Sequence, residues 1–89
     1  MSNVEPLPPL PIPADKWEQV AGRLGLTGRK KNVVELILKN QSDKQVGQWL
    51  NLKEGTVRTY MTRVFDCLQA RSRTEVLIRI LVEVCRLER

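Results

Sequence analysis

The sequence contains no histidine, and its 89 residues include only two cysteines, Cys67 and Cys85. A zinc site or a cysteine–histidine nucleophile needs a cluster of these residue types at short spacing, and no such cluster is available. The two cysteines instead suit small core or contact positions of a protein in a reducing compartment. We therefore expect no enzyme activity, no metal, no cofactor and no small-molecule substrate.

Long apolar runs are also missing. No stretch reaches the roughly 18 consecutive apolar residues that a membrane-spanning helix needs. The N-terminus lacks the basic region of a signal peptide and is interrupted by proline. These absences predict a cytoplasmic protein that has no membrane partner.

The charge of the chain is distributed unevenly. The net charge is +5 overall. Residues 1–28 carry a net charge of −1, whereas residues 29–89 carry thirteen basic and seven acidic side chains, a net charge of +6. A chain of this length forms one domain with a small core. A compact basic domain favours nucleic acid as its partner, although a well-solvated surface would also explain the charge.

All five prolines lie in residues 6–13, which read PLPPLPIP. Proline fixes the backbone angle φ and lacks an amide donor, so residues 1–14 are predicted to form an extended arm of polyproline II conformation. An SH3-domain ligand would carry a basic residue beside its prolines, and none stands there. A semi-rigid arm or an interdomain linker is the favoured interpretation.

A short amphipathic helix is predicted next, over residues 15–25. Asp15 is suitable as its N-cap, with Glu18 completing a capping box three residues later. Gly25 is suitable as its C-terminal stop. Its apolar stripe, which we expect to pack on the main domain, consists of Trp17, Val20, Ala21 and Leu24.

Periodic apolar residues predict four further helices, and no segment alternates with the period of a strand. Thr27, Ser42 and Ser72 stand where N-caps are needed. Asn51 stands at a turn that requires a left-handed backbone, which asparagine tolerates. The fold class is therefore predicted to be all-α. The expected helices span residues 28–40, 43–50, 54–68 and 73 to 86.

Residues 42–68, SDKQVGQWLNLKEGTVRTYMTRVFDCL, read as two helices joined by a tight turn. Val46 and Leu50 point inward from the first helix, and Gly47 between them allows the two helices to cross closely. This is the layout of a helix-turn-helix, whose second helix enters a DNA major groove. The inner stripe of that helix consists of Val57, Met61, Val64 and Leu68.

The opposite arc of the second helix is small and polar near its N-terminal end. Arg58 can reach a guanine edge with two hydrogen bonds, and Thr59 and Thr62 can present a methyl group to thymine or a hydroxyl to other bases. These three residues are the predicted base readers. Flanking residues suited to the DNA backbone are Lys53, Thr56, Tyr60 and Arg63. A merely solvated polar face is the simpler alternative.

Six short motifs follow one another at defined spacing: Leu26-Thr27-x-Arg29, Val33-Val34-x-Leu36, Ser42-Asp43-Lys44-Gln45-Val46, Leu50-Asn51-Leu52, Glu54-Gly55-Thr56-Val57-Arg58 and Arg71-Ser72-Arg73-Thr74-Glu75. In their order and spacing they resemble the LuxR/FixJ/GerE-type DNA-binding domain of bacterial transcription regulators. The resemblance runs from Leu26 to about Val84 and implies a four-helix domain, here assigned to residues 26–89. It also implies base contacts by Arg58, Thr59 and Thr62, and backbone contacts or nearby positions for Thr56, Arg63, Arg71 and Arg73.

The sequence departs from this family at a few positions. Lys30 stands where the family usually has glutamate, and helical phase puts it on the inner face, where a lysine needs an acidic partner or must extend to solvent. Gly47 replaces a common alanine, which should cost the helix about 0.5–1 kcal/mol. Thr62 is shorter than the usual residue, so the operator need not resemble that of any relative.

The last helix is apolar around most of its circumference. Val76, Leu77, Ile80, Leu81, Val84 and Leu87 form one broad face, and Ile78, Val82 and Cys85 extend it. The remaining polar strip consists of Glu75, Arg79, Glu83 and Arg86. A small domain cannot bury so much apolar surface against its own core, so a homodimer through Ile78, Val82 and Cys85 is predicted, as the resemblance also implies. Cover by the helix that carries Trp17 is the alternative.

The sequence as a whole predicts a sequence-specific transcriptional regulator that binds double-stranded DNA, with RNA polymerase as a further candidate partner. One alternative is a module like region 4 of a sigma factor, although the 71–75 loop and the long last helix argue against it. The other is a protein-interaction module that keeps the fold without binding DNA.

Overall fold

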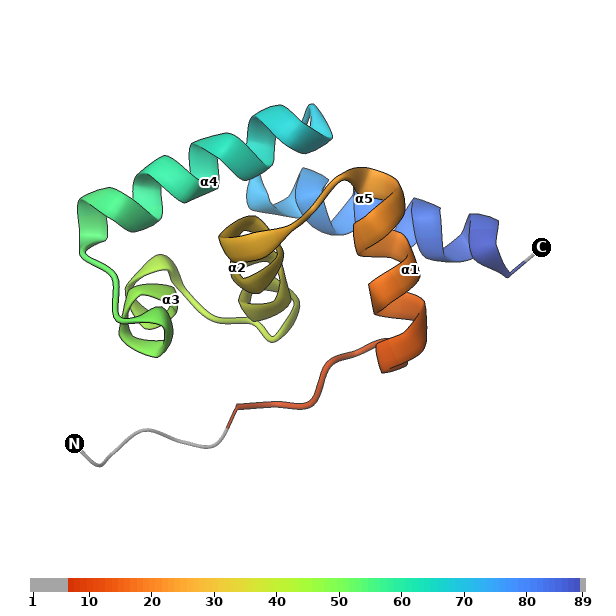
Figure 1. Cartoon of the computed structure of the whole chain (residues 1–89), viewed down its shortest axis with the longest axis horizontal. Coiled ribbons are helices and arrows are strands. Elements are labelled where there is room, and N and C mark those ends of the chain that lie inside the picture. Colours follow the sequence, from red (N-terminus) through yellow and green to blue (C-terminus); the bar gives the residue numbers. More distant parts are fainter. Residues whose placement is uncertain (1–6, 89) are drawn as a thin grey trace.

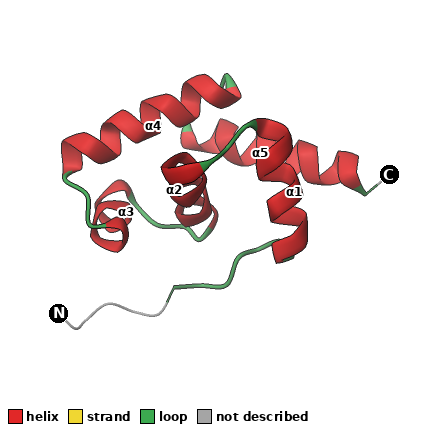
Figure 2. Cartoon of the chain, viewed as in Figure 1, coloured by secondary structure: helices red, strands yellow, loops and turns green. Residues whose placement is uncertain are grey.

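The computed structural model describes residues 7–88 of the chain. These residues form five α-helices and no strand, which confirms the predicted all-α class (Figure 2). The helices are α1 (Ala14–Leu24), α2 (Gly28–Leu38), α3 (Asp43–Leu50), α4 (Glu54–Leu68) and α5 (Arg73–Leu87). Within the described part of the chain, no helix combines the length and the apolar character needed to cross a membrane.

The helix α2 lies in the middle of the molecule, with α3 and α4 on one side and α1 and α5 on the other (Figure 1). It contacts α3, α4 and α5, while α1 packs on α5. All five helices and two connecting residues contribute to one core. Its fully buried members include Trp17, Val33, Val46, Val57 and Val76.

Ser42, Asn51 and Gly25 bound their helices as predicted, whereas Thr27 stands at the N-cap position of α2 without a side-chain capping hydrogen bond. Ser42 caps α3 by accepting a hydrogen bond from the amide of Gln45 at 3.2 Å, and the Gln45 side chain accepts one from the Ser42 amide at 2.8 Å. Asn51 ends α3 in the left-handed conformation with φ of 56°. Gly25 ends α1 with φ of 74°. Local sequence therefore accounts for the tight α3–α4 connection.

Gly47 lies where α3 crosses the start of α4. A β-carbon at this position would stand 2.8 Å from the carbonyl oxygen of Leu52 and 3.2 Å from a methyl carbon of Val57. The predicted close approach is therefore confirmed. An alanine would gain helix propensity at this position but would collide with backbone, which reverses the expected advantage of alanine.

The helix α1 begins earlier than its sequence pattern suggested. Pro13 occupies the N-cap position, so the assignment of Asp15 as N-cap was wrong, and Asp15 lies in the first turn. Glu18 does not form a capping box, because its carboxylate pairs with Lys31 of α2. The predicted apolar stripe is confirmed, since Trp17 is buried and its indole nitrogen donates to Glu35 at 2.6 Å.

The proline-rich segment is described only from residue 7 onward, so the part of the predicted arm in residues 1–6 lies outside the described residues. Residues 7–13 contain neither helix nor strand, and the chain bends at residues 11 and 12. Leu7, Leu10 and Ile12 are half-buried and pack against the core. These three apolar side chains between the prolines therefore bring the segment onto the domain.

The orientation of α5 differs from the prediction. Glu83, expected on the polar strip, is buried, and its carboxylate accepts a hydrogen bond from Arg23 of α1 at 2.7 Å. Leu77 and Leu81, expected on the core side, are exposed. The physical reason is that α1 packs along the Glu83 side and supplies the cation that allows a carboxylate to be buried there.

Candidate nucleic-acid interface

The two sides of α4 differ sharply in burial and polarity. Its predicted inner stripe is confirmed: Val57, Met61, Val64 and Leu68 are each at most 5% exposed. On the opposite side the side chains are exposed and mostly small or basic. This outward arc, called the polar arc below, consists of Gly55, Arg58, Thr59, Thr62 and Arg63.

Arg58 lies on the exposed arc next to an acidic neighbour. Its guanidinium stands 3.7 Å from the carboxylate of Glu54, one turn earlier on α4. Both side chains are more than three-quarters exposed, and an ion pair of this kind contributes little. The guanidinium is therefore free to leave Glu54 for a stronger, two-pronged hydrogen-bonding partner.

The two arc threonines orient their hydroxyls toward their own helix. Thr59 donates to the carbonyl of Gly55 and Thr62 donates to the carbonyl of Arg58, each at 3.1 Å. With the proton used in this way, each side chain offers its methyl group and an accepting oxygen lone pair. This arrangement suits the thymine methyl group and the amino groups of cytosine or adenine.

The flanking residues predicted to meet the DNA backbone lie around this arc. Lys53 and Thr56 are exposed at the start of α4. Tyr60 is half-buried, and the guanidinium carbon of Arg63 stands 5.6 Å from the centre of its ring. This contact holds Arg63 over the aromatic face and limits the directions in which it can point.

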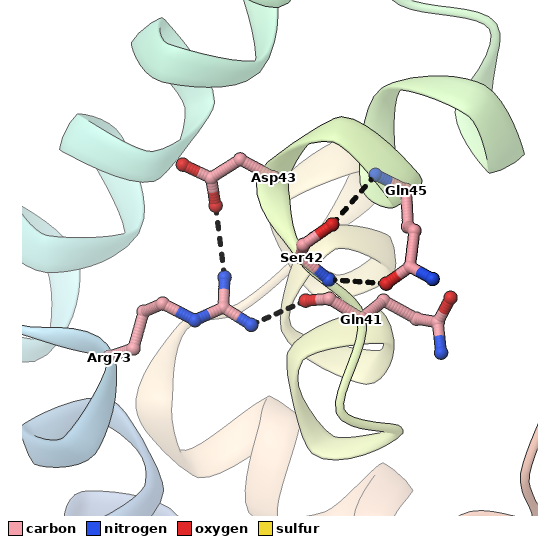
Figure 3. A network of polar contacts seen from close by, with 5 residues as sticks. All are labelled: Gln41, Ser42, Asp43, Gln45 and Arg73. Carbon is pink, nitrogen blue, oxygen red and sulfur yellow. Dashed lines mark hydrogen bonds and ion pairs between the residues drawn. The ribbon is translucent and has the colours of Figure 1, made fainter.

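Arg71 and Arg73, near the start of α5, have different surroundings. Arg71 is exposed. Arg73 is turned toward α3, where its guanidinium forms an ion pair with Asp43 at 2.9 Å and donates to the carbonyl of Gln41 (Figure 3). The intramolecular role of Arg73 was not foreseen from the sequence, because Asp43 and Gln41 lie about 30 positions away in the chain.

The Arg73 contact belongs to a small polar network at the α2–α3 connection. Buried Gln41 donates to the carbonyl of Lys39 at 3.0 Å and accepts from the indole nitrogen of Trp49 at 3.2 Å. Ser42 and Gln45 complete the N-terminal cap beside it (Figure 3). The network therefore holds the N-terminus of α3, the helix that packs against α4.

Lys30 is half-buried, and it does not belong to the buried core around Val33 and Val34. It lines an open hollow between the N-terminal turn of α2 and the C-terminal half of α4. Arg63 and Asp66 line the same hollow. The predicted conflict of a lysine on the inner face is therefore resolved, because the side chain stands at the rim of the α2–α4 contact.

A second exposed surface lies on α5 and is apolar. Leu77, Ile78, Leu81 and Val82 are 40–61% exposed, and Cys85 is exposed one turn further on. These five residues form one stripe along the helix, called the apolar face below. The alternative that α1 covers Ile78, Val82 and Cys85 was wrong, because α1 packs on the Glu83 side of α5.

Two helices joined at Asn51, with a small basic arc on the second, define a helix-turn-helix domain. The family model of the bacterial regulatory proteins of the luxR family (GerE) matches residues 24–80, which is more than half of the chain. The chain belongs to this family, which consists of regulators and not of enzymes. The resemblance inferred from the sequence motifs is thereby confirmed.

Among curated proteins, the transcriptional regulatory protein DesR of Bacillus subtilis (strain 168) is similar to the chain. The two are 37% identical over 54 residues, which represent 61% of this chain and 27% of DesR. The matched part of the chain thus spans about a quarter of the length of this relative. No solved structure shows significant similarity to the chain.

Proposed function

We propose that this protein is a sequence-specific transcriptional regulator that inserts α4 into the DNA major groove and acts as a symmetric homodimer through α5. The observation that supports groove insertion most strongly is the composition of the polar arc. Gly55 and the two threonines keep the arc shallow, so the helix can approach the base edges closely. Arg58 stands among them with only a weak, exposed partner.

Within this proposal the base readers are Arg58, Thr59 and Thr62. Arg58 would leave Glu54 and donate two hydrogen bonds to a guanine. The threonines would contact a thymine methyl group, or accept from an amino group, with the hydroxyls arranged as they are. The DNA specificity of this chain would therefore be concentrated on one face of α4, over about one helical turn.

The backbone contacts would come from residues around the arc: Lys53, Thr56, Tyr60, Arg63 and Arg71. Arg73 enters the proposal in a different way. Its guanidinium contacts Asp43 and Gln41 at the start of α3, so we propose that Arg73 positions the helix-turn-helix. Only the exposed part of its side chain would be available to a phosphate. Phosphate neutralisation should make binding strongly dependent on salt.

The dimer is proposed from the apolar face of α5. Exposed Leu, Ile and Val side chains on adjacent turns are unusual on a soluble monomer and mark contact surfaces. A second copy of the same helix is the matching partner, because a two-fold axis brings identical apolar stripes together. Two copies of α4 would then address two half-sites about 34 Å apart, one turn of DNA.

The experiment that tests this function is the selection of bound sequences from a random DNA pool. A regulator of the proposed kind should enrich a short motif in two copies related by a two-fold axis. The spacing of the copies would report the dimer. Enrichment of a single unrepeated motif would contradict the dimer, and absence of any enriched motif would contradict sequence-specific binding.

The alternatives predict different behaviour toward DNA and RNA polymerase. A protein-interaction module should give no mobility shift with random DNA at low salt, whereas the proposed regulator should shift it. A sigma-like module should bind core RNA polymerase stably without DNA. Membership of the luxR family favours the regulator over both.

A further inference from the structure

The hollow between α2 and α4 is lined by three basic side chains together with Thr27, Tyr60, Asp66 and Cys67. Arg29 and Lys30 line it from the first turn of α2, and Tyr60, Arg63 and Asp66 line it from α4. That first turn of α2 contains no acidic residue. Three cationic groups and a tyrosine thus face an open space with a single carboxylate among them.

None of the three cations takes part in an ion pair within residues 7–88. The adjacent Lys31 illustrates the contrast, because it is paired with Glu18 of α1. Lys30 is half-buried, so its charge acts with less screening by water than a fully exposed lysine would show. The hollow therefore has uncompensated positive charge.

The hollow is continuous with the polar arc. Arg63 belongs to the outward side of α4 and also lines the hollow, where its contact with the Tyr60 ring steadies it. An anion in the hollow would lie beside a DNA groove that α4 occupies. On duplex DNA the anions next to a major groove are the backbone phosphates, which occur every ~3.4 Å along each strand.

We propose that this hollow binds a DNA backbone phosphate beside the major-groove contact, with Arg29 and Lys30 as additional phosphate ligands from α2. The inference rests on the proposed function, because it needs α4 on DNA. It adds α2 to the helices that contact DNA. It also gives Lys30 a role, since a glutamate at this position would repel the phosphate.

The test is the salt dependence of DNA binding by Arg29→Gln, Lys30→Gln and the double variant, with Arg79→Gln of α5 as the control for removal of one exposed charge. Removing one phosphate ligand should reduce the magnitude of the slope of log K against log salt by about 0.9. The reduction in affinity should be equal on selected and random DNA, because phosphates carry no sequence information. Slopes no different from that of Arg79→Gln overturn the inference.

A duplex carrying neutral methylphosphonates locates the contact. Replacing the phosphate that meets the hollow should weaken binding by the wild-type protein but cause no further weakening in the double variant. Equal weakening of both proteins at every phosphate scanned overturns the inference. Thermal melting of each variant checks folding, and the exposed Arg29 gives a variant in which the α2–α4 contact is left intact.

Two further outcomes separate the possible failures. If Arg58→Ala removes sequence preference while the hollow variants keep the control slope, the proposed function stands and the hollow does not bind phosphate of DNA. If the wild-type protein shifts no DNA at low salt, both proposals fail. Calorimetry with inorganic phosphate completes the test. If the protein binds free phosphate tightly while the hollow variants keep the control slope of log K against log salt, the ligand of the hollow is free phosphate and not the DNA backbone, and the inference is overturned.

Discussion

The helices α4 and α5 have the same length, 15 residues, and each buries one stripe against the core, yet their exposed surfaces are opposite in character. The polar arc of α4 consists of small and basic side chains, which water solvates well. The apolar face of α5 exposes large aliphatic side chains on adjacent turns. One small domain therefore exposes two surfaces of different chemistry, one suited to a polyanion and one suited to an apolar partner such as a second copy of the chain.

The largest expected effect comes from Val82→Glu, which places a charge within the apolar face. If that face joins two copies, the loss of paired binding should lower affinity for a two-half-site duplex by about 10²–10⁴-fold. Sedimentation should show the monomer mass. Binding to a single half-site should change little.

The control for Val82→Glu is Arg79→Gln, which changes the net charge by the same amount on the polar side of α5. This variant should remain a dimer and bind both duplexes nearly as the wild type does. If Val82→Glu sediments with the same mass as the wild-type protein, the apolar face is not the dimer contact. The proposal that α4 binds DNA while α5 joins two copies would then be contradicted.

The next effect concerns the polar arc. Arg58→Ala should weaken binding to the selected sequence by about 1–3 kcal/mol, because it removes two hydrogen bonds to one base. Preference at one base position should relax, which competition with single-base variants of the operator would measure. Arg71→Ala is the comparison, since removal of a backbone ligand should weaken binding to all sequences alike. If Arg58→Ala behaves as Arg71→Ala does, Arg58 is not a base reader.

An effect of similar size on stability is expected at the α3–α4 crossing. Gly47→Ala should lower the free energy of unfolding by about 1–3 kcal/mol, because the added β-carbon would overlap the Leu52 carbonyl. The matched control is Gly22→Ala on α1, where the added carbon would meet nothing within 4 Å apart from its chain neighbours and its own helical backbone. That variant should gain about 0.5–1 kcal/mol. Urea denaturation measures both, and equal shifts would mean that the crossing is not tight.

The smallest effect is expected for Glu54→Gln. It removes the weak partner of Arg58 and one negative charge beside the N-terminal end of the polar arc. Affinity for DNA should rise by less than about 1 kcal/mol, in keeping with an exposed pair. Fluorescence anisotropy at low salt would measure this change, with Glu88→Gln beyond the end of α5 as the control. A fall in affinity would show that Glu54 positions Arg58 for binding.

Local sequence predicted the helix-turn-helix well. The bounds of α3 and α4, the cap at Ser42 and the left-handed turn at Asn51 all depend on residues within one or two turns of each other. Gly47 was also predictable, because a glycine on the inner face of an amphipathic helix indicates a close crossing. The base readers followed from helical phase and stay a prediction.

The features that the sequence did not reveal depend on contacts between distant segments. The rotation of α5 could not be read from its own pattern, because an almost uniformly apolar helix does not specify which side faces the core. The burial of Glu83 depends on Arg23, 60 positions away. The hydrogen bonds of Arg73 likewise depend on Asp43 and Gln41, about 30 positions away. In each case an ion pair or hydrogen bond between helices decided the arrangement.

The Arg73 contact has a mechanical consequence. It ties the first turn of α5 to the start of α3, and α4 packs against both of these helices, so the helix proposed to join two copies and the helix proposed to read bases are linked by direct contacts. Each base pair inserted between two half-sites turns them relative to each other by about 34–36°. The linked helices of the proposed dimer would resist that rotation. Its affinity for DNA should therefore depend on the spacing of the two half-sites as well as on their base sequence.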